Sequence, residues 1–228
     1  MSEADTIVKT TVASGHAGLM DSMYRHQRHI YDLTRKYYLF GRDRTIRALK
    51  VPPGGSLLEV GCGTGRNLLL AHRRYPTARL YGLDISQEML ISARNAFRGL
   101  PQTPAFRVAD ATTFTAEDFE ADGFDRIMIS YALSMIPDWT AAVDAAIDAL
   151  APGGELHIVD FGQQEHLPAW FGGVLRGWLR RFHVTPRADL KEVLAERARA
   201  CDGRIVFEDI GGGYAWRAVI TARREQNA

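Results

Sequence analysis

The chain is poor in the residues that build metal and disulfide sites. Its 228 residues include two cysteines, Cys62 and Cys201, which are too few and too isolated for a disulfide framework or a zinc site. Its seven histidines show no ligand spacing with nearby acids. The formal net charge is only +1, which gives no bulk attraction to nucleic acid. We therefore expect neither a metal nor a nucleic acid as a partner.

The chain also has no long apolar run. No stretch approaches the length of a membrane span, and the N-terminal region lacks the apolar core of a signal peptide. Internal repeats and low-complexity segments are absent from the sequence as well. With 46% hydrophobic residues, the chain is long enough to bury one sizeable core. These features predict a soluble protein of the cytoplasm, and they say nothing about its oligomeric state.

Strands and helices are expected to alternate after the Pro-Pro-Gly-Gly breaker at residues 52–55. The segment 151–154, Ala-Pro-Gly-Gly, predicts a helix stop that leads into a strand. Two apolar segments on either side of Gly211-Gly212-Gly213 predict a terminal β-hairpin. Strands are expected near 56–61, 79–84, 105–110, 125–130, 155–161, 204–210 and 214–221, and helices near 64–75, 86–98 and 139–150.

Residues 57–65, Leu-Leu-Glu-Val-Gly-Cys-Gly-Thr-Gly, are the most informative stretch. A short apolar strand enters a turn with three alternating glycines, which permit a positive φ or the close approach of a ligand. Asp84 ends the next strand, and such a carboxylate can accept hydrogen bonds from both hydroxyls of a ribose. A glycine turn followed by a downstream acid is typical of a nucleoside-binding βαβ unit.

The spacing of the glycines separates two kinds of cofactor. A dinucleotide fingerprint needs G-x-G-x-x-G, and its last position would be Arg66 here. The chain has G-x-G-x-G preceded by Glu59, which resembles motif I of the class I S-adenosylmethionine (SAM) methyltransferases. The resemblance implies an α/β, Rossmann-like sheet of seven strands with the last strand antiparallel and helices on both faces. It also implies SAM as cofactor and S-adenosylhomocysteine (SAH) as product.

The cofactor contacts follow from this resemblance. Asp110 ends the third strand at the family position whose acid meets the adenine amine, although a helix N-cap is the alternative. Met89 packs either against the adenine ring or in the core. Glu59 is expected at the amino-acid end of the cofactor, because a carboxylate in an apolar strand needs partners. The residues predicted to contact the cofactor are Tyr31, Glu59, Gly61, Cys62, Gly63, Thr64, Gly65, Asp84, Ile85, Met89, Asp110, Ala111 and Ser130.

Aromatic and acidic residues at the carboxyl ends of the strands suggest an amine as methyl acceptor. Aromatic faces attract the ammonium ion that forms as methyl groups are added to an amine, although each ring alone is also explained by core packing. Tyr214 and Trp216 are expected to point the same way by the two-residue period of a strand. The predicted catalytic residues are Tyr38, Tyr131 and Asp160, and the predicted acceptor contacts are Arg35, Lys36, Ser134, Met135, Trp178, His183 and Tyr214.

Two further stretches bear on where the acceptor lies. Residues 24–47 carry seven Arg or Lys against two Asp, which is either an anion-binding region or a solvated helix face. Residues 167–182 place Trp, Phe and Leu at helical spacing beside Arg176, Arg180 and Arg181. This pattern fits a helix lying on an anionic membrane, although taken alone it favours an ordinary helix packed on the sheet.

Several segments resemble a narrower family, the bacterial betaine-lipid N-methyltransferases, which are relatives of the phosphatidylethanolamine N-methyltransferases. They are residues 16–21, the Tyr- and Arg-rich stretch at 24–38, residues 41–44, the segment at 130–139 that begins Ser-Tyr-Ala-Leu-Ser-Met-Ile-Pro, and Val-Asp-Phe-Gly at 159–162. The resemblance implies threefold methylation of the amine of diacylglyceryl-homoserine by an enzyme peripherally associated with the inner membrane face. Its expected organisation is a flexible stretch at 1–15 and one methyltransferase domain at 16–228, with a helical cap at 16–50 and an α/β core at 56–221.

Other functions stay open from the sequence. The acceptor is alternatively phosphatidylethanolamine, or a soluble amine or phenol. A nucleotide-binding oxidoreductase is disfavoured by Arg66 at the third glycine position. A SAM-binding protein without catalytic activity, which assists another enzyme of lipid synthesis, is a further hypothesis.

Overall fold

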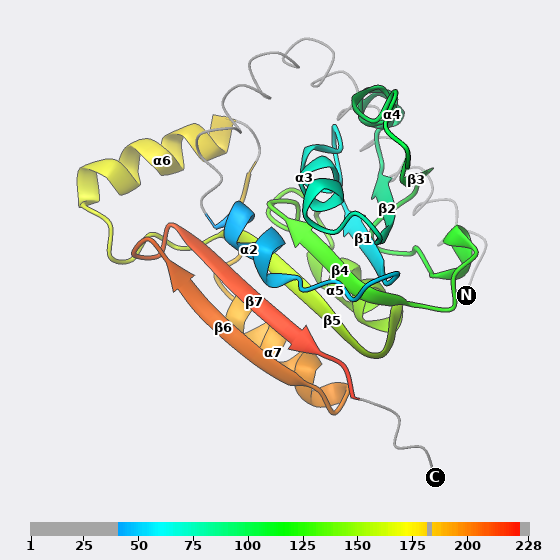
Figure 1. Ribbon diagram of the computed structural model, residues 1–228. Helices are drawn as coiled ribbons and strands as arrows, with labels where there is room; N and C mark the ends of the chain where they lie inside the picture. The colour runs from blue at the N-terminus through cyan, green and yellow to red at the C-terminus, as the bar shows by residue number, and fades with distance from the viewer. Residues whose placement is uncertain (1–40, 182–183, 224–228) are drawn as a thin grey trace, which may run out of the picture.

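The structure is a computed structural model that describes residues 41–181 and 184–223 (Figure 1). The predicted flexible stretch at 1–15 and most of the predicted helical cap at 16–50 lie outside the described residues. So do five residues to which the sequence assigned roles, namely Tyr31, Arg35, Lys36, Tyr38 and His183.

Seven strands form one sheet in the order β3-β2-β1-β4-β5-β7-β6. The strands β1 to β5 pair in parallel, whereas β7 runs antiparallel to both of its neighbours. The order reverses between β1 and β4, and ligands of open α/β sheets bind beyond the carboxyl ends of the strands at such a point. The strands are β1 (Ser56–Val60), β2 (Arg79–Asp84), β3 (Ala105–Val108), β4 (Phe124–Ser130), β5 (Leu150–Phe161), β6 (Arg204–Ile210) and β7 (Ala215–Thr221).

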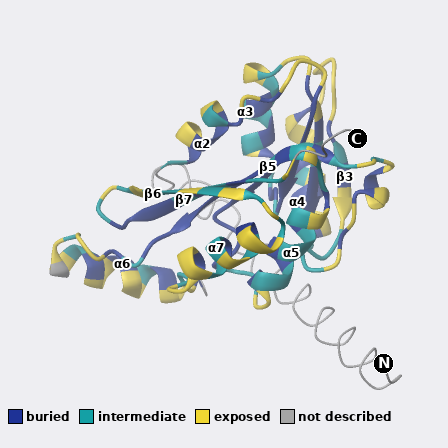
Figure 2. Cartoon of the chain, turned by 90° about the horizontal axis from the view of Figure 1, so that it is seen from below, coloured by how far each residue is buried: buried dark blue, intermediate teal, exposed yellow. Residues whose placement is uncertain are grey.

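Helices cover both faces of the sheet, and Figure 2 shows the buried residues concentrated on the strands between them. Leu57 and Met128 pack in a cluster with α3 and α4, while Leu58 and Ile127 pack in a cluster with α5 and α7. This alternation follows from the two-residue period of a strand that is covered on both sides. The helices are α2 (Arg42–Ala48), α3 (Arg66–Arg74), α4 (Gln87–Ala96), α5 (Trp139–Asp148), α6 (Ala169–Arg181) and α7 (Leu190–Ala200), with a short 3₁₀ turn, η1 (Glu117–Phe119).

Two expectations about the elements were wrong or incomplete. The predicted helix stop at 151–154 lies inside β5, which begins at Leu150 and pairs there with Phe124 before the register shifts. Gly153 has a φ of 74°, so the glycine permits an irregularity within the strand and does not end a helix there. Helix α7 was not predicted at all. Its signal is the spacing of Leu190, Leu194 and Ala198, which are all buried.

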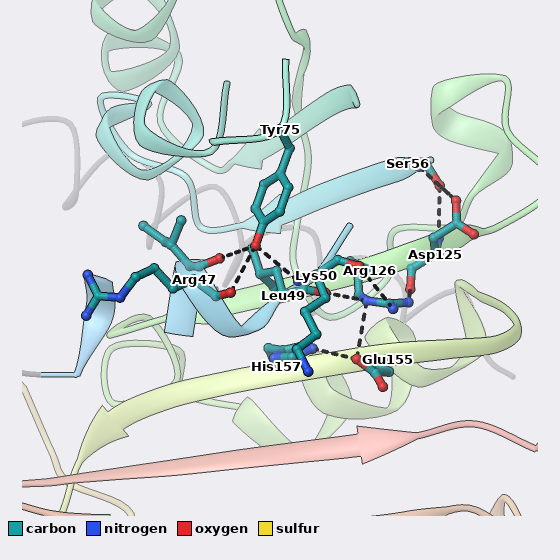
Figure 3. Close-up of polar contacts among 10 residues, drawn as sticks. Arg47, Leu49, Lys50, Ser56, Tyr75, Asp125, Arg126, Glu155 and His157 are labelled. Atoms are coloured by element: carbon teal, nitrogen blue, oxygen red, sulfur yellow. Dashed lines mark hydrogen bonds and ion pairs between the residues drawn. The ribbon is translucent and has the colours of Figure 1, made fainter. Parts of the chain in front are cut away.

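A polar cluster fixes α2 to the amino ends of the strands (Figure 3). The hydroxyl of Tyr75 lies 2.8 Å from the carbonyl oxygen of Ile46 and accepts a hydrogen bond from the Lys50 N–H. Arg126 donates from Nε to the carbonyl oxygen of Leu49 at 2.6 Å. The end of α2 is therefore held at the edge opposite to the glycine turn.

His157 belongs to the same cluster and predicts a pH dependence of stability. Burial lowers its pKa, although a hydrogen bond with Glu155 opposes the shift, and the charges of Arg217 and Arg126 lower the pKa further. The unfolded chain therefore binds more protons than the folded chain below the ordinary histidine pKa of about 6.5. Stability contributed by neutral His157 is present above that value and is lost as the pH falls through the folded pKa.

We expect His157→Gln to reduce the pH dependence of the free energy of unfolding below about pH 6.5, by up to about 1.4 kcal/mol per pH unit. Urea denaturation at several pH values measures it. His166→Gln, at an exposed histidine between β5 and α6, is the matched control. An unchanged slope in His157→Gln would show that this histidine does not titrate between the two states.

Candidate active site

The backbone angles and the close packing of the turn after β1 require glycine. Gly61, Gly63 and Gly65 have φ values of 69°, 54° and 74°, which other residues rarely adopt. A Cβ at Gly61 would lie 2.8 Å from the Cβ of Ala132. Helix α3 begins directly after Gly65, so the turn brings the N–H groups of its first residues to the carboxyl edge of the sheet.

Asp84 ties this turn to the end of β2. Its Oδ2 accepts a hydrogen bond from the Gly63 N–H at 2.8 Å, and its Oδ1 accepts one from the Ser86 N–H at 2.9 Å. Each carboxylate oxygen can accept more than one hydrogen bond, so these contacts are compatible with the predicted contact to ribose hydroxyls. The side chain is thus oriented by backbone on two sides.

Glu59 is buried in β1, and its Oε1 accepts a hydrogen bond from Asn67 Nδ2 at 2.6 Å. Asn67 lies in the first turn of α3 and was not predicted as part of the site; its signal was a polar amide directly after the glycine motif. Cys62, within the glycine turn, is also buried. Burial raises the pKa of its thiol, and the charges of Asp84 and Glu59 raise it further, so Cys62 stays protonated and fills space.

The predicted adenine contacts lie at the neighbouring strand end. Asp110 Oδ1 accepts hydrogen bonds from the N–H and the hydroxyl of Thr112, which makes a local turn and not the helix N-cap considered as its alternative. Met89 on α4 is buried in the same cluster as Tyr131, which agrees with its core alternative and leaves the adenine contact as a prediction. Thr64, Ile85 and Ala111 lie at these turns and are partly exposed.

Tyr131 directly follows β4, and Asp160 lies at the end of β5. The two residues therefore lie at the ends of adjacent strands. Tyr131 has a φ of 55°, and its N–H donates to the carbonyl oxygen of Val159 at 2.8 Å. A positive φ in a bulky residue is strained and is often found at functional sites. The Tyr131 ring lies 4.7 Å from that of Phe161, and the Phe161 ring lies 6.1 Å from that of Tyr214.

The two ionisable groups are tuned by burial. The pKa of Tyr131 is raised by burial and by the nearby Tyr214 and Asp160, while the charge of Arg42 lowers it. The pKa of Asp160 is raised by burial, although N–H groups of Phe161 and Ser134 donate to its two oxygens and the Arg187 charge favours ionisation. A buried carboxylate with a raised pKa is a suitable proton acceptor.

The remaining predicted residues surround this pair. The hydroxyl of Ser130 is buried and has no hydrogen-bond partner among the residues that the structure describes, whereas a hydrogen bond from the Ser134 side chain helps to lower the pKa of Asp160. Met135 and Trp178 pack beside the cluster of Tyr131 and Tyr214. One prediction was wrong: Trp216 packs in the other cluster, where its ring lies 5.6 Å from Phe207, because Tyr214 precedes β7 in the glycine turn and does not share its alternation.

Sequence reasoning missed two arginines at this edge. Arg187 donates from Nε to Leu133 O at 3.1 Å and from Nη2 to Ile136 O at 2.6 Å, so it holds the segment that follows Tyr131. Arg42, at the start of α2, is buried near Tyr131. In the described ranges 41–181 and 184–223, no group of three or more His, Cys, Asp and Glu side chains could hold a metal ion.

The fold and this edge match the architecture of one class of protein. A seven-stranded sheet with an antiparallel β7, a glycine turn after β1 and an acid after β2 are the architecture of the class I SAM-dependent methyltransferases, as predicted. Residues 57–154 match the family model described as a methyltransferase domain. That segment contains the turn, Asp84, Asp110 and Tyr131.

Solved structures support the same fold. The plantazolicin methyltransferase BpumL, in complex with SAH and a triazolic desmethylPZN analog, matches with a TM-score of 0.70 at 16% identity, covering 98% of this chain and 100% of that chain. An O-methyltransferase family protein from Burkholderia thailandensis matches with a TM-score of 0.66 at 16% identity, covering 90% of this chain and 63% of that chain. The predicted fold is confirmed, and SAM, with SAH as product, is the cofactor that these findings support.

Curated relatives match over part of their length. A trans-aconitate 2-methyltransferase of Variovorax paradoxus (strain S110) is 36% identical over 113 residues, which are 50% of this chain and 41% of that protein. The ubiquinone/menaquinone biosynthesis C-methyltransferase UbiE of Desulfotalea psychrophila is 31% identical over 135 residues, 57% of this chain and 53% of that protein. The chain thus spans about half the length of these relatives, and neither is named for a lipid amine.

Proposed function

We propose that the chain transfers methyl groups from SAM to the amine of a membrane lipid headgroup, with diacylglyceryl-homoserine as the preferred acceptor. The observation that carries the proposal is the cluster of Tyr131, Phe161 and Tyr214 at the sheet edge that also bears Asp84, with the buried Asp160 close enough for its charge to act on Tyr131. Aromatic rings and a carboxylate together suit an ammonium ion that grows more apolar with each methyl group.

The residues divide into donor and acceptor sides. SAM supplies an electrophilic methyl group on a sulfonium. Asp84 and Glu59 bind and orient the donor, while Tyr131 and Tyr214 line the acceptor side and exclude water from it. The attacking amine must be neutral, so its proton passes to a base or to water, and Asp160 is placed to hold it. Arg187 keeps the segment after Tyr131 in place through its carbonyl bonds.

Helix α6 supports a membrane-bound acceptor. Leu175 and Leu179 are buried in the cluster with Tyr131, whereas Trp170 and Val174 on the same helix are 73% and 68% exposed. Arg176, Arg180 and Arg181 are exposed along this helix, which carries no acidic residue. Figure 1 shows α6 projecting from the sheet. An exposed Trp among arginines fits the surface of an anionic bilayer, where the chain would be a peripheral protein of the inner membrane face.

In the part of the chain that the structure describes, no helix has the length and apolar character needed to cross a bilayer.

We expect the double variant Trp170→Ser/Val174→Ser to bind vesicles containing phosphatidylglycerol at least about 10-fold more weakly than the wild type. The reason is that two exposed apolar side chains no longer enter the membrane interface. Phe171 and Trp178, which the sequence also suggested, are partly buried in the protein and are less suitable for substitution. Vesicle sedimentation measures the binding.

The matched control is Val206→Ser, which removes a side chain that is 64% exposed on β6. Vesicles of phosphatidylcholine alone test the contribution of charge. Equal binding of the wild type and the double variant to the anionic vesicles would reject α6 as the contact.

A second candidate follows from the relatives, whose names point to trans-aconitate and to carbon methylation of quinone precursors.

One assay separates the candidate acceptors. The purified chain with labelled SAM is offered vesicles of diacylglyceryl-homoserine or phosphatidylethanolamine, trans-aconitate, a demethylmenaquinone, and soluble amines and phenols. Mass spectrometry identifies the product. Products of the homoserine lipid with up to three added methyl groups support the proposal. Methylation of another acceptor alone overturns it, and methylation of none favours a non-catalytic SAM-binding protein.

A further inference from the structure

Arg42 carries a buried charge with little compensation. Its side chain is only 6% exposed, and its Nε donates to Asp43 Oδ1 at 3.1 Å. That carboxylate belongs to the adjacent residue and is itself 59% exposed, so solvent screens it. Asp43 is the only hydrogen-bond or ion-pair partner of the Arg42 side chain among the residues described. A buried guanidinium normally needs several acceptors to offset the loss of water.

Other arginines of the structure show the usual arrangement. Arg126 donates to the carbonyl oxygens of Leu49 and Asp125 and pairs with Glu155, and Arg187 donates to two carbonyl oxygens. Arg44, two residues along α2, pairs with Glu208 at the surface. Arg42 differs from all three because its planar, multiply donating group is buried without a matching set of protein acceptors.

The position of Arg42 is the acceptor side of the site. A Cβ added to Gly41 would lie 2.6 Å from Ile210 Cδ1 and 3.4 Å from Val159 Cγ2, so the start of α2 is pressed against β5 and β6 near their ends at this edge. Val159 also accepts the hydrogen bond of the Tyr131 N–H. Gly41, the residue before Arg42, and Tyr131 therefore both adjoin Val159, and the Arg42 charge acts on the Tyr131 phenol.

We propose that Arg42 binds the carboxylate of the methyl acceptor, and that the site thereby selects acceptors in which a carboxylate stands close to the amine. This inference rests on the proposed function and names the feature of the headgroup that is recognised. A guanidinium and a carboxylate form two parallel charge-assisted hydrogen bonds, which orient as well as bind. In a homoserine headgroup both groups share one carbon, so a carboxylate on Arg42 brings the amine towards Tyr131. Arg35 and Lys36, which the sequence predicts as acceptor contacts, lie outside the described residues.

The test compares Arg42→Met with wild type on two lipids, diacylglyceryl-homoserine and its carboxamide, which lacks the negative charge. We expect Arg42→Met to raise KM for the acid about 30-fold or more, with a smaller change in kcat and no change in the Kd for SAM. On the carboxamide the two proteins should be equal. Arg42→Lys should recover part of the affinity, and Arg44→Met, on the same helix, should behave as wild type.

Two results would overturn the inference: an equal rise of KM for acid and carboxamide, which is the sign of a structural role, or a wild type that does not distinguish the two lipids. If wild type methylates neither lipid, the proposed function fails, and Arg42 is then judged by binding alone. In that case the Nε–H signal of Arg42 is followed by NMR during titration of the wild type with acetate in the presence of SAH. A saturable shift supports a carboxylate site, and a signal that does not respond rejects it. This measurement also decides the matter should Arg42→Met fail to fold.

Discussion

Asp84→Ala is expected to raise the Kd for SAM by at least about 100-fold. The variant removes a charged acceptor for two ribose hydroxyls, and hydrogen bonds to charged groups contribute about 1.5–3 kcal/mol each, where about 1.4 kcal/mol is a factor of ten. It also frees the N–H groups of Gly63 and Ser86, which Asp84 holds at 2.8 and 2.9 Å. The turn and the ligand site are weakened together.

Calorimetric titration with SAM measures this loss, and circular dichroism establishes that the variant is folded. Asp122→Ala removes an exposed acid before β4 and is the matched control. Gly63→Val is expected to have a similar effect, because a β-branched residue rarely adopts a φ of 54° and the turn would shift. If SAM bound Asp84→Ala as tightly as wild type, the assignment of this edge as the cofactor site would be wrong.

Asp160→Asn is expected to lower kcat about 100-fold or more while the Kd for SAM changes little. Proton transfer by a positioned group contributes typically 10²–10⁴-fold. The amide keeps the size of the side chain and an oxygen to accept the Phe161 or Ser134 N–H, but it cannot take a proton. Single-turnover methylation gives the rate of transfer, and calorimetry gives the affinity.

The raised pKa of Asp160 adds a pH test with a defined sign. The folded chain binds a proton at Asp160 more readily than the unfolded chain, so this group destabilises the fold as the pH rises from the ordinary aspartate pKa through the raised one. Activity that requires the ionised carboxylate rises over the same window. Asp160→Asn should lose both dependences. If the activity of Asp160→Asn still rose with pH as that of the wild type does, Asp160 would be excluded as the proton acceptor.

The parts of the site that lie close together in sequence could be predicted. The turn at Gly61–Gly65 and the acid at Asp84 are each encoded by a short stretch with its own physical signature, an apolar strand that ends in glycines or in a carboxylate. The adjacency of Tyr131 and Asp160 followed from the rule that parallel strands end at one edge. These predictions needed only local patterns and one topological rule.

The rest depends on contacts between distant segments. Arg187 acts on the segment after Tyr131 from 54 and 51 positions away, and nothing in its local sequence indicates those partners. Similarly, the alternation within β7 could not be extended to Tyr214, because the start of the strand is set by its pairing with β5. The apolar stripe of α6 identified a helix, but only packing separated its buried Leu175 from its exposed Val174.

Helix α2 connects the two edges of the sheet. Its last turn is held at the amino edge by Tyr75 and Arg126, and its first residue, Arg42, lies at the proposed acceptor side, where the preceding Gly41 adjoins Val159 and Ile210. The helix is about 10 Å long, so it acts as a strut between the two. The placement of a guanidinium at the reaction side is thus set by anchoring at the remote side. Acceptor preference can consequently change in evolution through residues that never meet the acceptor.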